Sequence, residues 1–315
     1  VNDRDTNLFE NMWPLPEGVA YNSYLIVDEK TALLDTVKIT KVNGFIENLK
    51  KNLNGRDLDY LVIHHMEPDH SGCYLSVLDI YPNLTFVGNK KARAMFKDYL
   101  DMEPENFIEV KEGDTLSLGK RTLTFVNTPM VHWPESMVSY EITDKILFSQ
   151  DIFGGFGALN GTIFDDEMNF DFFRDEIRRY YSNIVGKYSK QAAKALEKVK
   201  TLEINVICPV HGIVWRSQPN MIIDEYIRLA NQINEEGVVI AYGSMYGKMA
   251  DTLARYLAEE GIRNVKVFDV SKTHVSYILS EIWKYKGFIL GSCTYNNSVY
   301  PNVNQLLYTL RMNKM

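Results

Sequence analysis

One segment of the chain, residues 58–72, constrains the fold and the chemistry more than any other. It reads LDYLVIHHMEPDHSG, in which an apolar run typical of a buried strand leads directly into a loop. The loop holds three histidines, a glutamate and an aspartate within positions 64–70, and Pro68 and Gly72 disfavour a regular helix there. A buried strand followed by so many metal-binding side chains indicates a functional site at a strand end.

Strand and helix patterns alternate up to about residue 234. Apolar, β-rich runs predict strands at 23–35 (a hairpin), 58–65, 121–129, 136–142, 145–151 and 203–210. Strong helix formers and apolar periodicity predict helices at 40–53, 89–100, 187–200 and 220–237, the last ending at a glycine. This alternation is typical of an α/β layered domain, which we assign to residues 1–234.

After residue 234 the pattern becomes a strict succession of strand, helix and strand. Buried strands are predicted at 237–242, 264–270 and 286–292, with an amphipathic helix at 249–261. This is the start of a doubly wound parallel sheet, which we assign to residues 235–315. Because about 80 residues are few for such a domain, we expect an unpaired sheet edge, an open apolar face, and a full protein that is longer or partly disordered.

The composition argues against several classes of function. The 315 residues carry a net charge of −7 with a pI of about 5.5, which disfavours a surface for nucleic acid. The longest apolar runs are too short to span a bilayer, so we expect no membrane partner. The cysteines at 73, 208 and 293 form no Cys-x-x-Cys pair and fit a reducing cytoplasm, where we expect the protein.

The spacing within the crowded loop predicts how its side chains point. His65, Glu67 and Asp69 occupy alternate positions, so an extended backbone would direct all three to one ion. His70 would then point elsewhere, towards a second ion. The alternative is a polar, partly solvated loop with an N-capping aspartate. That interpretation suits a single such residue better than four of them within six positions.

Three more ligand-type residues lie where predicted strands meet loops. His132 follows one strand in TPMVHWPESM, Asp151 ends KILFSQD, and His211 ends VICPVHG. Functional groups of α/β proteins gather at strand ends. Each residue could alone be a satisfied core or turn residue, but together with the loop they supply seven candidate ligands, enough for two metal ions.

The whole pattern resembles the flavodiiron proteins, also called A-type flavoproteins. The resemblance rests first on H-x-E-x-D-H followed by His, Asp and His at the family's intervals. It rests also on the stretches PEGVAYNSYLI, EPDHSG, HWPESM and ICPVHG and on the flavodoxin-like segment, and it covers residues 8–315. It implies a metallo-β-lactamase-like αββα sandwich with two irons, followed by an incomplete flavodoxin-like doubly wound sheet. The implied ligands are His65, Glu67 and His132 for one iron, Asp69, His70 and His211 for the other, and Asp151 as the catalytic bridge. His64 lies outside the pattern.

Glu67 favours iron over zinc. Hydrolases of the same fold usually have a histidine at this position, and imidazole-rich sites suit zinc, whereas carboxylate-rich sites suit iron or manganese. Two ferrous ions carry a charge of about +4, which Glu67, Asp69, Asp151 and one bridging hydroxide would neutralise, and a neutral cluster costs less to bury.

Two C-terminal segments resemble the flavin-binding loops of the family. YGSMYGKMADTLA (242–254) links a strand to a helix as an anion-binding turn would, although Met249 replaces the usual threonine and the loop is about three residues short. A purely structural turn is the alternative. GSCTYNNSVYP (291–301) matches Gly-Ser-Pro-Thr-x-Asn-Asn with Cys293 in place of proline. The FMN contacts that the resemblance implies are Ser244, Met245, Tyr246, Gly247, Thr294, Tyr295, Asn296 and Asn297.

The resemblance implies an oxidoreductase that passes electrons through FMN to the diiron site and reduces dioxygen to water, nitric oxide to nitrous oxide, or both. It also implies a head-to-tail homodimer with one subunit's FMN beside its partner's irons; Trp133 lies near that contact or in the core. Because no Cys-x-x-Cys pair provides a rubredoxin domain, we expect an external donor such as rubredoxin or a flavin reductase. Two alternatives are a dinuclear zinc hydrolase of the same fold and a flavodoxin-like carrier with a degenerate metal domain.

Overall fold

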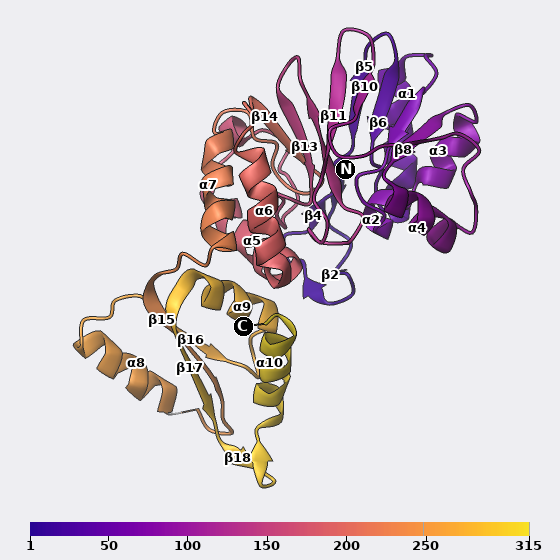
Figure 1. Cartoon of the computed structure of the whole chain (residues 1–315). Coiled ribbons are helices and arrows are strands. Elements are labelled where there is room, and N and C mark those ends of the chain that lie inside the picture. The colour runs from indigo at the N-terminus through magenta and orange to yellow at the C-terminus, as the bar shows by residue number, and fades with distance from the viewer. Residues whose placement is uncertain (248, 315) are drawn as a thin grey trace.

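The computed structural model describes residues 1–247 and 249–314. The chain forms a large N-terminal region with two facing sheets and a small C-terminal region with one sheet (Figure 1). Residues 231–234 connect the two, and the domain boundary that we propose at residue 234 lies in this connection. Within the described ranges, no helix is long and apolar enough to cross a membrane.

The first sheet of the N-terminal region has five strands. In spatial order they are β5 (Tyr24–Val27), β6 (Thr31–Leu34), β7 (Tyr60–Val62), β8 (Thr85–Gly88) and β9 (Phe107–Glu109). β5 and β6 form the predicted antiparallel hairpin, and β6 to β9 run parallel. Because β7 ends at Val62, the crowded loop begins at the carboxyl end of a central strand.

The second sheet also has five strands. In spatial order they are β10 (Thr115–Ser117), β11 (Thr122–Asn127), β12 (Met137–Glu141), β13 (Ile146–Gln150) and β14 (Val206–Pro209). β10 to β13 form an antiparallel meander, and β14 pairs parallel to β13 with a register shift between Phe148 and Gln150. The parallel pairing places the residues that follow β13 and β14 side by side.

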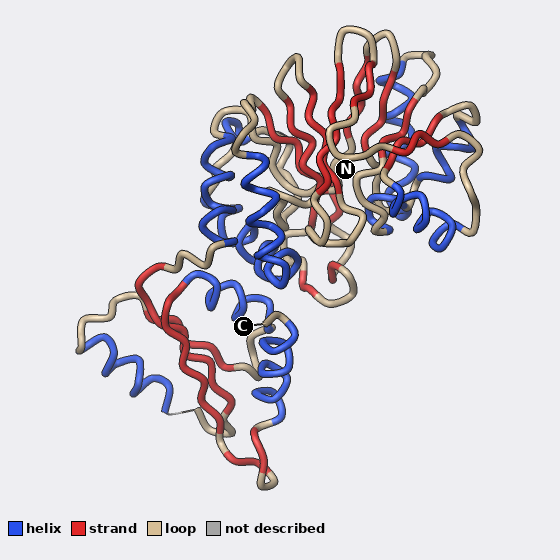
Figure 2. The backbone as a smooth tube through the Cα atoms, viewed as in Figure 1, coloured by secondary structure: helices blue, strands red, loops and turns tan. Residues whose placement is uncertain are grey.

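Helices cover the outer faces of both sheets (Figures 1 and 2). Over the first sheet lie η1 (Ile39–Lys41), α1 (Val42–Leu53), α2 (Pro68–Ser71), α3 (Tyr74–Ile80) and α4 (Lys90–Leu100). Over the second lie η2 (Asp165–Glu167), α5 (Asp171–Tyr180), the π-helical turn η3 (Tyr181–Val185), η4 (Gly186–Tyr188), α6 (Ser189–Val199) and α7 (Pro219–Ala230). Leu34 and Phe148 pack between the sheets, whereas their neighbours Leu33 and Leu147 pack with the helices. The predicted αββα sandwich is confirmed.

The first 21 residues form short strand pairs with one another, and one buried carboxylate binds them to the sandwich. β1 (Asn2–Asp3) pairs with β4 (Val19–Ala20), and β2 (Leu8–Phe9) pairs with β3 (Trp13–Pro14). The Asp3 carboxylate accepts hydrogen bonds from the N–H and hydroxyl of Thr6 and forms a 3.0 Å ion pair with Lys41. Burial alone would raise the pKa of Asp3, but these contacts lower it to about 2.

The C-terminal region is a parallel sheet with helices on both faces. Its strands, in spatial order, are β16 (Val265–Asp269), β15 (Glu235–Gly243) and β17 (Tyr285–Ser292), and the hairpin of β18 (Thr294–Tyr295) and β19 (Ser298–Val299) follows. α8 (Met249–Glu259) lies on one face, and α9 (Val275–Lys284) and α10 (Pro301–Met312) pack on the other (Figure 1). Among the described residues, β17 pairs only with β15, and a cavity of about 440 Å³ beside α8 is lined by Ile240, Leu253 and Ile289. These features agree with the expected unpaired edge and open apolar face.

One predicted helix end is wrong. The helix expected at 220–237 ends at Ala230, and Gly237 lies inside β15 instead of capping a helix. A Cβ at Gly237 would lie 2.4 Å from the Tyr285 ring, so the glycine is required by close packing of neighbouring strands. The sequence analysis also missed α5 and α9, because α5 is dominated by charged residues and α9 by strand-favouring aromatic and β-branched ones.

The two regions meet where α5 and η3 pack against α9. Arg178 donates from Nε to the carbonyl of Ser280 at 3.2 Å. The guanidinium of Arg179, itself buried, lies 4.6 Å from the centre of the Tyr277 ring. Trp283 donates from Nε1 to a main-chain carbonyl of the N-terminal region at 3.1 Å. These contacts fix the orientation of the small sheet, whose β18 hairpin lies at the end remote from the N-terminal region (Figure 1).

We predict that Asp3→Asn destabilises the protein by about 1–2 kcal/mol at neutral pH, after discounting for solvent screening. The folded-state pKa of about 2 is below the usual value near 4, so the stabilisation is present above pH 4 and is lost as the pH falls through 2. Urea unfolding at pH 7 and at lower pH measures the difference from wild type, which should shrink on acidification. A difference that grows on acidification would contradict the assignment.

A candidate dinuclear metal centre

The seven predicted ligands meet at strand ends from both sheets. His65 follows β7, Glu67 precedes α2, Asp69 and His70 lie within α2, His132 lies in the loop from β11 to β12, and Asp151 and His211 follow β13 and β14. Each of the seven is at most 9% exposed. Charged groups buried to this degree need charged or metal partners.

The loop after β7 is not extended throughout, so one expectation was wrong. Glu67 has extended dihedral angles (φ −58°, ψ 140°), but Pro68 begins the short helix α2. Proline at a first helical position is preorganised for a helical turn. The turn directs Asp69 away from His65 and Glu67, and Asp69 joins a different set of side chains.

The first ligand group contains four side chains, His65, Glu67, His132 and Asp151. Glu67 Oε2 lies 3.2 Å from His65 Nε2 and 3.0 Å from His132 Nε2. Asp151 Oδ2 lies 3.5 Å and 3.4 Å from the same two nitrogen atoms. Two carboxylate oxygens and two imidazole nitrogens therefore face a common point.

The second ligand group contains Asp69, His70 and His211. Asp69 Oδ1 lies 3.3 Å from His70 Nε2, and Asp69 Oδ2 lies 3.2 Å from His211 Nε2. Asp151 Oδ1 lies 3.6 Å and 3.5 Å from these two nitrogen atoms. Because Asp151 directs one oxygen to each group, its carboxylate lies between them.

The spacing and hydrogen bonding of these atoms suit metal ions. Donor atoms about 2.1 Å from one ion lie about 3 Å from one another, close to the separations within each group. Both oxygens of Asp69, both ring nitrogens of His70 and Nε2 of His211 are buried without a hydrogen-bond partner in the described part of the chain. Such atoms are costly unless a ligand satisfies them, so the residues fit a pair of ions.

The acidic and basic members of the two groups also shift one another's pKa. Burial alone would lower the pKa of His132, but hydrogen bonds to Asp151 and Glu67 raise it to about 10. Burial alone would raise the pKa of Asp151, but His132 and His70 hold that pKa well below its usual value. Metal ions that bind here must displace imidazole protons and then balance the carboxylate charge themselves.

Several contacts to the ligands escaped the sequence analysis. The Tyr180 hydroxyl donates to Asp151 Oδ1 at 2.7 Å, and the side-chain amide of Gln150 donates to Asp151 Oδ2. The Nδ1 of His211 lies 2.9 Å from the carbonyl oxygen of Ala20. Tyr180 and Ala20 lie far in the chain from the ligands that they contact, so no spacing rule connects them, and a backbone carbonyl leaves no signal in the sequence.

The motif HWPESM supplies two further contacts. Glu135 Oε1 lies 2.7 Å from His65 Nδ1. The Trp133 ring packs edge-on against His65, with 5.1 Å between ring centroids. Trp133 therefore packs against the first ligand group of its own chain, and whether it also contacts another subunit stays a prediction.

His64 points away from both ligand groups, in agreement with its exclusion from the ligand pattern. Its Nδ1 lies 2.7 Å from Asp35 Oδ2 and its Nε2 lies 2.8 Å from the Ser139 hydroxyl. All three side chains are buried. This network links the two sheets behind the metal centre.

A cavity of about 410 Å³ gives access to the ligand groups. It is lined by Phe9, Glu10, Tyr21, Glu67 and Asp69, among others. Burial and the nearby Glu67 raise the pKa of Glu10 to about 7. The cavity is a route by which a small molecule reaches Glu67 and Asp69.

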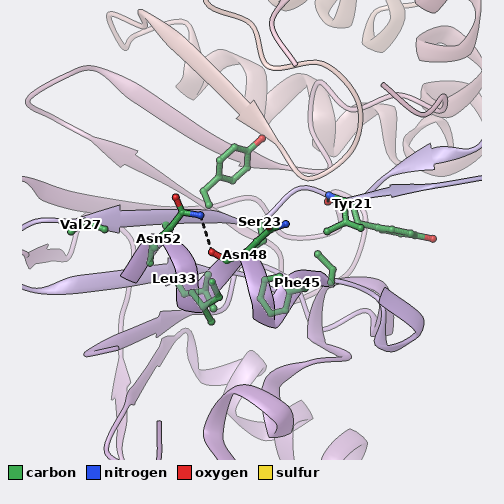
Figure 3. Close-up of a pocket in the computed structure, with 12 residues that line it drawn as sticks. Tyr21, Ser23, Val27, Leu33, Phe45, Asn48 and Asn52 are labelled. Carbon is green, nitrogen blue, oxygen red and sulfur yellow. Dashed lines mark hydrogen bonds between the residues drawn. The ribbon is translucent and has the colours of Figure 1, made fainter. Parts of the chain in front are cut away.

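A separate cavity of about 390 Å³ lies between α1 and the hairpin of β5 and β6 (Figure 3). Ser23, Asn48 and Asn52 line it together with apolar side chains such as Leu33 and Phe45. Its lining residues include no histidine, cysteine, aspartate or glutamate. It lacks the side chains that usually bind metal ions.

The two predicted flavin loops lie side by side at one end of the small sheet. Gly243 of β15 pairs with Ser292 of β17, so both loops leave the sheet at neighbouring carboxyl ends, where α/β sheets bind ligands. In the first loop the Ser244 hydroxyl accepts the N–H of Gly247 at 3.1 Å. The Tyr246 ring is 86% exposed. Residue 248 of this loop lies outside the described residues.

The second flavin loop is a tight hairpin. Asn296 and Asn297 have φ angles of 48° and 59°, which a two-residue turn of this kind requires. Thr294 and Tyr295 form the strand that enters the turn, and the Tyr295 side chain is 43% exposed. The turn therefore presents amide and aromatic groups to solvent. All eight predicted flavin contacts gather in these two loops.

Comparison with known proteins identifies related sequences. Residues 19–212 match a family model described as ODP family beta lactamase. The chain is 39% identical over 295 residues to an uncharacterised protein of Methanocaldococcus jannaschii, covering 93% of this chain and 74% of that one. It is 37% identical to a nitric oxide reductase of Moorella thermoacetica (92% and 73%). It is 35% identical to an anaerobic nitric oxide reductase flavorubredoxin of Vibrio vulnificus, covering 94% of this chain but only 61% of that one.

Two solved structures are similar over nearly the whole chain. The rubredoxin oxygen:oxidoreductase of Desulfovibrio gigas aligns with a TM-score of 0.93 at 34% identity, over 99% of this chain and 79% of that one. The flavodiiron protein of Giardia intestinalis aligns with a TM-score of 0.93 at 30% identity, over 99% and 77%. Both alignments include the metal centre and the small sheet.

We predict that ferrous iron, added without oxygen, stabilises the metal-free protein and that Asp151→Asn removes most of this effect. At one hundred times the dissociation constant a ligand adds about 2.7 kcal/mol, equivalent to a rise of several degrees in melting temperature. Calorimetric melting curves with and without iron measure it.

Glu141→Gln is the matched control for this prediction. Glu141 is equally buried, but its carboxylate lies at the other end of β12, where it accepts the N–H groups of Thr143 and Asp144 in a turn and of Thr122 in β11. Its variant should keep the iron-dependent rise in melting temperature. Equal rises in wild type and Asp151→Asn would contradict the bridging arrangement.

Proposed function

The chain belongs to the flavodiiron protein family, and on this premise we propose that it reduces dioxygen to water, nitric oxide to nitrous oxide, or both. Electrons would pass through FMN to two irons. The observation that carries the proposal is the Asp151 carboxylate, which directs one oxygen to each of two buried ligand groups. Relatives named nitric oxide reductase and rubredoxin oxygen:oxidoreductase support both substrates.

His65, Glu67, His132 and Asp151 would hold one iron, and Asp69, His70, His211 and Asp151 the other. Each position then has two imidazoles and two carboxylate oxygens, a mixed donor set suited to iron. A bound diferrous pair supplies electrons and room for both atoms of dioxygen or for two nitric oxide molecules. The protein orients the bridge through the hydroxyl of Tyr180 and the amide of Gln150.

The zinc hydrolase is not favoured. Its characteristic histidine is replaced by Glu67, whose Oε2 lies within 3.2 Å of both histidines of the first group. A hydrolase also has no use for the small sheet with its two exposed loops. The carrier with a degenerate metal domain is not favoured either, because all seven ligand types are present and face one another.

FMN would bind at the two loops of the small sheet. Ser244, Met245, Tyr246 and Gly247 would surround the phosphate side, and Thr294, Tyr295, Asn296 and Asn297 the ring. Three observations support this placement: the neighbouring carboxyl ends of β15 and β17, the solvent-facing aromatic rings, and the turn amides at Asn296 and Asn297. A phosphate group would compete with Ser244 for the N–H of Gly247.

A head-to-tail homodimer would bring these cofactors together. The β18 hairpin lies at the end of the small sheet remote from the N-terminal region (Figure 1), so flavin bound there is remote from the metal centre of its own chain. A second copy in the reverse orientation would place its loops near the cavity at Glu67 and Asp69. The donor would be a separate protein, rubredoxin or a flavin reductase, in the cytoplasm, consistent with three unpaired cysteines.

The proposed function predicts the cofactor content of the intact protein. Protein purified without oxygen should contain about two irons and one FMN per chain and should consume dioxygen or nitric oxide with a reduced donor. Elemental analysis, flavin fluorescence after release and gas-electrode assays measure these quantities. Two zincs, no flavin and no gas consumption would contradict the proposal.

The dimer predicts complementation between two inactive variants. Asp151→Asn lacks a working metal centre, and the double variant Tyr246→Ala/Tyr295→Ala lacks two proposed flavin contacts without removing buried side chains. Each alone should be inactive. Subunit exchange in an equal mixture should restore about a quarter of wild-type activity, because about half of the dimers are then mixed and each mixed dimer has one intact flavin–iron pair out of two. No recovery in verified mixed dimers would contradict electron transfer between subunits.

A further inference from the structure

Glu135 is a buried carboxylate that belongs to neither ligand group. It lies between β11 and β12 and is 0% exposed. Its Oε1 accepts the backbone N–H of Met66 at 2.9 Å and lies 2.7 Å from His65 Nδ1. Its own carbonyl oxygen accepts from the side chain of Asn89, the N-cap of α4, at 2.6 Å. Two contacts therefore hold the carboxylate in place, and a third holds the backbone of the same residue.

The only ion-pair partner of Glu135 in the described part of the chain is His65. Its second oxygen, Oε2, has no hydrogen-bond partner there. A buried carboxylate without a lysine or arginine partner costs free energy, so its charge must be balanced through the imidazole. The other side of that imidazole, Nε2, faces Glu67 and Asp151.

The contact with Glu135 determines the tautomer of His65. A carboxylate only accepts, and Oε1 already receives the N–H of Met66, so Nδ1 of His65 carries the proton. Once a metal ion displaces the proton on Nε2, the lone pair of the neutral imidazole is on that nitrogen, which faces the first ligand group. A hydrogen bond to an anion also makes the imidazole a stronger electron donor to a metal.

Within residues 1–247 and 249–314, neither histidine of the second group has a carboxylate beside its Nδ1. The Nδ1 of His211 lies 2.9 Å from a neutral carbonyl oxygen, that of Ala20. The Nδ1 of His70 has no hydrogen-bond partner among the described residues. The two metal positions each have two histidines and two carboxylate oxygens. They differ because, in the part of the chain that the structure describes, a negatively charged group contacts Nδ1 of a histidine only in the first ligand group.

We propose that Glu135 is a positioning residue that acts through His65. It makes the first ligand group a stronger electron donor to a bound metal ion than the second ligand group. This inference rests on the proposed function. An iron bound there would have a lower ferric/ferrous reduction potential than an iron bound by Asp69, His70 and His211. The two irons would then differ in reduction potential.

The test is Glu135→Gln in the full chain loaded with iron. Glutamine keeps the size of the side chain and an acceptor oxygen for His65 and Met66, but it removes the negative charge. Anaerobic redox titration followed by Mössbauer and electron paramagnetic resonance spectra gives the potential of each iron. We expect the reduction potential of one iron to rise and that of the other iron to stay nearly unchanged. The rise is about 60 mV for each tenfold decrease in the ratio of ferric affinity to ferrous affinity at that position.

The amide nitrogen of the variant would be buried without an acceptor, so some loss of stability is expected in any case. A lower melting temperature with both potentials unchanged would overturn the proposal, because Glu135 would then be only structural. Glu141→Gln, the buried carboxylate outside the site, should leave both potentials at their wild-type values.

Metal affinity separates this inference from the proposed function. Should wild-type protein retain no iron, the proposed function is contradicted, but calorimetric titration with Co²⁺ still measures two binding steps. We expect Glu135→Gln to weaken one step about 10–100-fold and to leave the other unchanged. Equal affinities in wild type and variant, or equal weakening of both steps, would overturn the role of Glu135.

Discussion

The carboxylate of Asp151 joins the two halves of the metal centre, and the arrangement around it depends on how the chain presents this one side chain. Oδ2 faces His65 and His132, and Oδ1 faces His70 and His211. The preceding residue, Gln150, has a left-handed φ of 56°, and the pairing of β13 with β14 shifts register there. This irregularity at the strand end places the carboxylate between ligands that come from both sheets.

The αββα fold is well suited to this purpose. The central strand β7 delivers the crowded loop, while the parallel pair β13 and β14 delivers Asp151 and His211 side by side. The N-terminal segment closes the site, since Phe9 packs edge-on against His211 at 5.3 Å and the Ala20 carbonyl contacts His211 Nδ1. Most of the free energy of this packing comes from apolar burial on both faces of each sheet, which leaves the strand ends available for polar chemistry.

Much of this was predictable from the sequence because ligand identity and spacing survive as a linear pattern. The pattern identified the seven side chains that meet, and strand periodicity predicted both kinds of sheet. Local arguments failed at two places. The alternate spacing suggested that Asp69 faces the same ion as His65, but Pro68 begins a helical turn that moves Asp69 to the second group, where the family resemblance had put it. Gly237 packs under Tyr285 rather than ending a helix. Tyr180 and Glu135 were missed because contacts between distant segments have no linear signature.

The central claim is that two irons lie on either side of Asp151, and anomalous diffraction tests it most directly. Crystals of protein reconstituted with ferrous iron would be measured on both sides of the iron absorption edge. The account predicts two iron peaks, one among His65, Glu67 and His132 and one among Asp69, His70 and His211, with the Asp151 carboxylate between them. A single peak, or peaks away from Asp151, would contradict it.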